Sequence, residues 1–181
     1  MTKWWMLMMF PLLAAEPVKL IKTKVNDRIT VSVPEGWRPM DALDFTQRYP
    51  SVRAPLAAFT DIDRLVDFSV NISATQWPDR DLPMAQKFFK ASLTNMFDRV
   101  EMIEEGVHTV NKKELIFFEF QSRVNGNRQQ EGFTDPVLKY TYIQYYLQAD
   151  RTFVFSFNCP RRMKDQWQET AREMMNSIKI K

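Results

Sequence analysis

Alternating apolar and polar residues predict strands along most of the chain. Between Leu65 and Ala74, every second side chain is apolar and the intervening ones are Asp, Ser or Asn. This alternation is typical of a strand with one buried face and one polar face. Short connections at Asn111-Lys112 and at Ala149-Asp150-Arg151 favour hairpins. By the same rules, further strands are predicted over Arg28–Val33, Glu101–Thr109, Lys113–Val124, Lys139–Gln148 and Thr152–Asn158.

Apolar residues at spacings of three and four predict two amphipathic helices. The first covers Leu82–Val100, and Pro83 suits its first turn. The second begins at Pro160 and carries its apolar stripe to Ile178. A short helix or turn is predicted around Asp41–Tyr49. Strands in series with a few helices predict an α+β fold, in which helices cover a central antiparallel sheet.

This order of elements resembles the PsbP-like family, which includes the extrinsic PsbP protein of photosystem II and the Ran-binding Mog protein. The likeness covers residues 26–181 and implies an α/β/α sandwich as a single domain over residues 16–181. The family has no common catalytic motif that could be transferred to this chain, and a photosynthetic role does not follow from the resemblance. The segments that carry it are Ile29–Trp37, Lys113–Phe120, Tyr142–Phe157 and Trp167–Ile178.

The first fifteen residues have the layout of a secretory signal peptide. Lys3 precedes an apolar run that ends in two small residues, Ala14 and Ala15. The run is shorter than the roughly 20 residues that cross a bilayer and contains Pro11, so no stable membrane span is expected. A buried N-terminal helix or an uncleaved anchor stays open as an alternative. We expect an exported protein, either periplasmic or secreted.

Composition excludes several classes of function. The chain has 25 Lys and Arg against 22 Asp and Glu, an excess too small for a nucleic-acid-binding surface. With one Cys and one His, a single subunit cannot build a zinc or iron–sulfur site from these residue types. The four Gly are too far apart for a nucleophile elbow, a phosphate loop or a dinucleotide fingerprint. We therefore expect no cofactor, no nucleic-acid partner and no enzymatic activity.

The remaining reactive residues have structural interpretations that are favoured over functional ones. His108 is expected to be a structural histidine, although a catalytic base is the alternative. Cys159 is expected to be a small packed residue, although a thiol activated by Arg161 and Arg162 is conceivable. The carboxylate pairs are interpreted as turn formers or solvated charges: Asp61/Asp63, Asp79/Asp81 and Glu104/Glu105.

Two groups of residues are candidates for binding. Tyrosines of the Lys139–Gln148 strand, represented by Tyr142, could line a groove with the polar side chains of Ser69 and Asn71. A lip to this groove would come from Trp37, Phe45 and Tyr49. Separately, Arg161 and Arg162 stand at the positive end of a predicted helix dipole, where they could contact an anion or an acidic partner.

These observations favour a non-enzymatic protein-binding or assembly module in the cell envelope. Its protein partner would contact the Trp37–Arg53 segment and the polar loop Asn125–Asp135. The alternative is a periplasmic carrier or sensor that binds a small ligand in the tyrosine-rich groove between sheet and helix. A hydrolase remains a third hypothesis, because acid–base sites can be built from carboxylates far apart in sequence.

Overall fold

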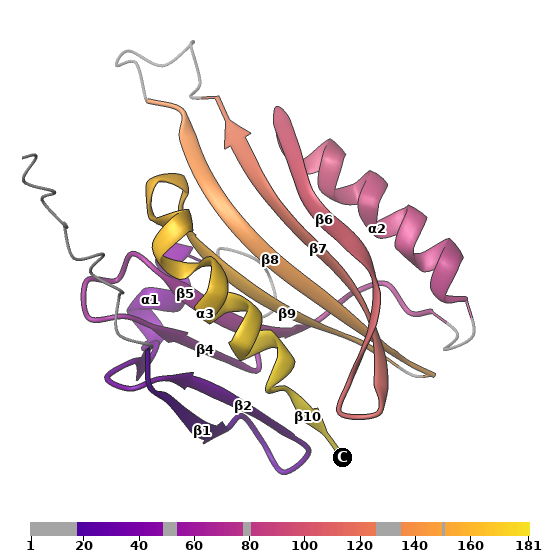
Figure 1. Ribbon diagram of the computed structural model, residues 1–181, viewed down its shortest axis with the longest axis horizontal. Coiled ribbons are helices and arrows are strands. Elements are labelled where there is room, and N and C mark those ends of the chain that lie inside the picture. The colour runs from indigo at the N-terminus through magenta and orange to yellow at the C-terminus, as the bar shows by residue number, and fades with distance from the viewer. Residues whose placement is uncertain (1–17, 49–53, 78–80, 126–134, 150) are drawn as a thin grey trace, which may run out of the picture.

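A seven-stranded antiparallel sheet is the main element of the chain (Figure 1). The computed structural model describes residues 18–48, 54–77, 81–125, 135–149 and 151–181. The strand order is β3-β4-β5-β9-β8-β7-β6. The predicted central antiparallel sheet is therefore confirmed. Its strands are Arg38–Pro39 (β3), Ala57–Thr60 (β4), Asp67–Ile72 (β5), Arg99–Val110 (β6), Lys113–Val124 (β7), Val137–Gln148 (β8) and Arg151–Pro160 (β9).

A second, smaller sheet was not predicted. It joins Leu20–Lys24 (β1) and Lys179–Ile180 (β10) to the two edges of Ile29–Pro34 (β2), so both ends of the described chain meet on one strand. β2 is the strand predicted over Arg28–Val33, and its alternate residues Ile29, Val31 and Val33 are buried. β1 escaped prediction because its side chains are exposed or half-buried and show no apolar alternation.

Helices cover both faces of the large sheet. Lys164–Asn176 (α3), which follows a 3-10 turn over Arg161–Met163 (η1), packs with the small sheet on one face. Leu82–Met96 (α2) packs on the other face, against β6 and β7 (Figure 1). We call these the α3 face and the α2 face. The short helix Ala42–Arg48 (α1) corresponds to the element predicted around Asp41–Tyr49. The α/β/α layering is thus confirmed.

Two predicted helix boundaries were wrong. α2 ends at Met96 instead of Val100, because Phe97 takes an extended backbone conformation and the β6 strand begins at Arg99. The apolar Val100 belongs to the alternation of that strand. Pro160 is the last residue of β9 and does not open α3, which begins at Lys164 after one 3-10 turn. Spacing alone cannot separate a helix from a strand that follows it directly.

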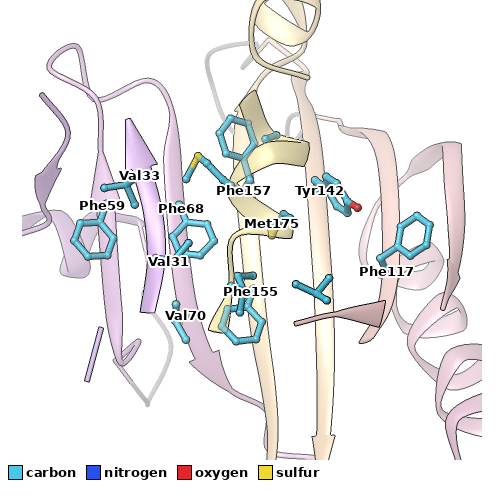
Figure 2. Close-up of a cluster of buried hydrophobic side chains, with 14 of the residues drawn as sticks. Val31, Val33, Phe59, Phe68, Val70, Phe117, Tyr142, Phe155, Phe157 and Met175 are labelled. Carbon is cyan, nitrogen blue, oxygen red and sulfur yellow. The ribbon is translucent and has the colours of Figure 1, made fainter. Parts of the chain in front are cut away.

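The core of the α3 face is rich in aromatic rings. Phe157 of β9 lies at its centre, fully buried, between the sheet and α3 (Figure 2). The ring centroid of Phe157 lies 6.2 Å from that of Trp37 and 6.1 Å from that of Trp167. Tyr140 approaches the same ring edge-on, with 6.3 Å between centroids. One phenyl ring therefore contacts α3, β8 and the segment after β2.

A buried carboxylate fastens α3 to the sheet. Glu119 of β7 is fully buried and accepts hydrogen bonds from the Arg172 guanidinium, Nε at 3.0 Å and Nη2 at 2.8 Å. The Tyr140 hydroxyl donates to the other carboxylate oxygen at 3.0 Å, and the Gln168 amide donates to it as well. Burial and the neighbouring carboxylate raise the pKa of Tyr140, so its hydroxyl stays protonated as a donor. The charge of Glu119 is thus compensated by residues from α3 and β8.

Candidate binding surface

The structure does not bring Tyr142 together with Ser69 and Asn71. Tyr142 lies on the α3 face, beside Phe157 in strand register and in the same buried cluster (Figure 2). Ser69 and Asn71 lie on the opposite face, because they alternate along β5 with the α3-face residues Phe68 and Val70. Ser69 is buried and its hydroxyl accepts a hydrogen bond from the Asn71 amide at 3.1 Å. The sheet itself separates these polar residues from Tyr142.

The residues predicted to border the tyrosine-rich groove do not form one site where they are described. Trp37 stacks on Phe157 and belongs to the α3-face core. Phe45 is half-buried on α1, on a different element from Trp37. Tyr49 lies outside the described residues. So do residues 50–53 of the Trp37–Arg53 segment and residues 126–134 of the polar loop.

Arg161 and Arg162 instead belong to a surface rich in cations. It lies at the end of the sheet where β7 and β9 finish and β8 and α3 begin, at the top of Figure 1. Two adjoining hollows of about 670 and 100 Å³ share Gln121, Leu138 and Arg161 as lining residues. We call this surface the cationic end and define it by the five cations that line the hollows: Arg99, Arg123, Arg161, Arg162 and Lys164.

Few carboxylates balance these cations. Glu101 accepts from Arg99 at 3.0 Å and from Arg161 at 3.4 Å, while Lys164 lies 3.2 Å from Asp165. These pairs are largely solvent-exposed and contribute little to stability. Within the described residues, neither Arg123 nor Arg162 has a carboxylate within 4 Å. The positive end of the α3 dipole adds to the same potential.

Sequence analysis missed Arg99 and Arg123, although a signal for them existed. The two residues are paired across the β6–β7 hairpin. A hairpin centred on the predicted Asn111-Lys112 turn places the far ends of its strands side by side, and Arg123 lies eleven residues beyond Lys112. What the sequence could not reveal is that Arg161 of η1 lines the same hollow as this pair.

The single cysteine and histidine have structural roles. Cys159 is buried in the α3-face core, and burial together with the charge of Asp67 raises the pKa of its thiol to about 12. The hypothesis of an activated thiol is therefore wrong. His108 packs on Phe117 and its Nε2 lies 2.9 Å from the Gln144 amide nitrogen. Burial lowers the pKa of His108, although Glu104 partly opposes this shift.

Two members of the carboxylate pairs, Asp61 and Glu104, make contacts within the fold. Asp61 closes the β4–β5 loop, since its carboxylate accepts from the backbone N–H groups of Leu65 at 2.8 Å and Val66 at 3.0 Å. Glu104 accepts from Arg172 at 3.3 Å. No group of three His, Cys, Asp or Glu side chains able to hold a metal ion occurs within the described ranges. None of the helices described is both long and apolar enough to cross a membrane.

Solved structures with a similar architecture are known. The chain is 14% identical to cyanobacterial PsbP (CyanoP) from Synechocystis sp. PCC 6803, with a TM-score of 0.59 over 97% of this chain and 99% of that one. The Ran-binding protein Mog1p of Saccharomyces cerevisiae gives a TM-score of 0.55 at 13% identity, over 91% of this chain and 96% of its own. This chain has the Mog1/PsbP-like fold.

A third solved structure with this fold is that of a mycobacterial protein. LpqN of Mycobacterium tuberculosis, described as involved in cell envelope biogenesis, is 13% identical, with a TM-score of 0.57 over 90% of this chain and 91% of its own. No family model and no curated protein matches the sequence. At these identities the Mog1/PsbP-like likeness fixes the fold, and the function has to be argued from the chain's own surface.

Proposed function

We propose that this chain is a non-enzymatic binding module in the cell envelope, and that its cationic end docks on an acidic surface of a protein partner. The observation that carries the proposal is an excess of positive charge around the two hollows. Five cations line them, but only two carboxylates do, Glu101 and Asp165. Like charges held this close repel one another, so folding alone does not favour them. An acidic partner would relieve that repulsion, and the field would steer its approach.

Two relatives in fold support this kind of role by analogy. The yeast relative is described as a Ran-binding protein, and the mycobacterial one as involved in cell envelope biogenesis. Leu138 and Pro160 add apolar surface beside the arginines. A mixture of arginine and apolar contacts is typical of protein–protein interfaces.

Charge reversal at the cationic end tests the docking proposal. The tagged chain is used to recover its partner from the cells that make it naturally, and binding of the purified partner is then measured by calorimetry. We expect Arg123→Glu/Arg161→Glu to weaken binding at least tenfold, because it turns attraction into repulsion. Raising the salt concentration should weaken binding of the unmodified chain.

The matched control for charge reversal is Lys22→Glu/Arg28→Glu, which changes the net charge equally on the small sheet, away from the cationic end. It should leave the affinity within about twofold. If both double variants bind alike, or if the partner surface is not acidic, docking through the cationic end is wrong.

Export is the second part of this proposal. Residues 1–15 would direct the chain across the inner membrane, and cleavage after Ala15 would leave Glu16 as the first residue. We expect mass spectrometry of the natively produced protein to find a mature N-terminus at Glu16 in the envelope fraction. Recovery of the intact chain from the cytoplasmic fraction would contradict export.

A further inference from the structure

The α2 face carries a strip whose character changes along the strands. On β8 the residues that face α2 run in order from a cation through a hydroxyl to apolar side chains: Lys139, Thr141, Ile143 and Tyr145. Residues of β9 lie opposite in register and follow the same trend: Asn158, Ser156 and Val154. Six residues of strand cover about 20 Å. We call these seven residues the amphipathic strip.

The apolar end of the strip forms the floor of a groove beneath α2. The groove has a volume of about 420 Å³. Its other wall comes from α2 and the residue that follows it: Phe88, Phe89, Leu93, Met96 and Phe97. Met96 is 67% exposed and Phe88 41% exposed, so apolar surface extends to solvent. This volume lies near the lower limit of ordinary ligand sites, which suits one slender molecule.

The polar end of the strip opens into a separate hollow of about 580 Å³. Lys139, Arg64 and Arg162 line it, and Asn158 belongs to both this hollow and the groove. Among the described residues, no carboxylate lies within 4 Å of Lys139 or Arg162. The carboxylate of Asp67 is also in the hollow and accepts a hydrogen bond from the Asn158 amide at 3.1 Å.

We propose that the α2 face binds one fatty acid, with its carboxylate at Lys139 and its hydrocarbon chain in the groove beneath α2. Burial of the chain against the aromatic wall supplies the apolar driving force. Lys139 supplies the charge for the head group, while Thr141 and Ser156 lie where the ligand changes from polar to apolar. This ligand differs from the protein partner proposed above. Lys139 lies on the opposite face of the sheet from Gln121, and its hollow shares Arg162 with the cationic end.

Calorimetric titration with laurate, below its aggregation concentration, tests the head-group contact. We expect one site per chain, and tighter binding of laurate than of dodecanol, which has the same chain without the charge. Lys139→Glu should weaken laurate binding about tenfold and leave dodecanol binding unchanged. Lys22→Glu is the matched control and should change neither. Equal affinity for laurate and dodecanol would overturn the assignment of the head group.

Neighbouring residues of α2 test where the chain lies. Ser92 lines the groove, whereas the adjacent Ala91 is exposed to solvent. Ser92→Phe should fill the groove and abolish binding of both ligands, and Ala91→Phe should leave binding within twofold. Circular dichroism checks that both variants fold. If Ser92→Phe folds and still binds laurate normally, or if the unmodified chain shows no saturable binding, the proposal is wrong.

The two binding proposals fail separately. Arg123→Glu/Arg161→Glu changes the cationic end but neither residue lines the groove or the hollow at Lys139. That double variant should therefore keep its laurate affinity. Conversely, Lys139 lies outside the set of residues that defines the cationic end, so Lys139→Glu should leave partner binding within a few fold.

Discussion

Replacing Phe157 by alanine is expected to lower the free energy of unfolding by about 3–5 kcal/mol. The phenyl ring is fully buried and contacts Trp37, Trp167 and Tyr140. Its removal leaves a cavity that these large, rigid rings cannot readily fill, and it weakens the contact between the sheet and α3. A chain of this size should lose about 6–20 °C in melting temperature.

The measurement is urea unfolding followed by circular dichroism, with Phe88→Ala as control. Phe88 is also a phenylalanine on an element that packs against the sheet, but it is 41% exposed, so its replacement should cost less than about 1 kcal/mol. An equal effect of the two substitutions would mean that the α3-face core does not depend on Phe157.

The sheet was predictable where the pattern is local. In the β6–β7 hairpin, Asn111 and Lys112 both have positive φ, as expected for a two-residue turn between strands of right-handed twist. β7 was predicted with its observed ends because the turn fixes where it begins and a run of mostly apolar residues marks its centre. Every residue from Leu115 to Phe120 is buried. Such features depend on neighbours in sequence.

The candidate site was less predictable because it depends on pairing between distant strands. Ser69 faces α2 with Ser156, and Ser156 lies opposite Ile143, so Tyr142 must point the other way. Deciding this from sequence requires the β5–β9 register, which joins strands about 87 residues apart, as between Ser69 and Ser156. The amphipathic strip itself lies in the local β8–β9 hairpin. Its groove was not predicted because the other wall comes from α2, which is distant from that hairpin in sequence.

Glu119 shows a second limit of sequence patterns. Its alternation with the apolar Phe118 and Phe120 is the pattern of a polar, solvent-exposed position. In the structure α3 lies over it and supplies Arg172 and Gln168 as partners. A charged residue within a strand can therefore be buried when a helix distant in sequence brings the opposite charge, and the binary pattern does not record this.

Replacing Arg172 by methionine is expected to lower the free energy of unfolding by about 3 kcal/mol. The substitution leaves the buried Glu119 carboxylate without its cation, and breaking a buried pair in this way costs about 3–5 kcal/mol. The side chain of Arg172 is 37% exposed, so solvent screening places the effect at the lower end of that range. The melting temperature should fall by about 6–12 °C.

A second variant identifies the cause of that loss. Adding Glu119→Gln to Arg172→Met removes the buried charge and keeps an amide that can bond Tyr140 and Gln168, so we expect the double variant to recover most of the lost stability. Arg99→Met, which removes a largely exposed arginine, should change stability by less than about 0.5 kcal/mol. If Arg172→Met unfolds at the same urea concentration as the unmodified chain, water and the remaining two donors suffice for Glu119, and the ion pair does not hold α3 on the sheet.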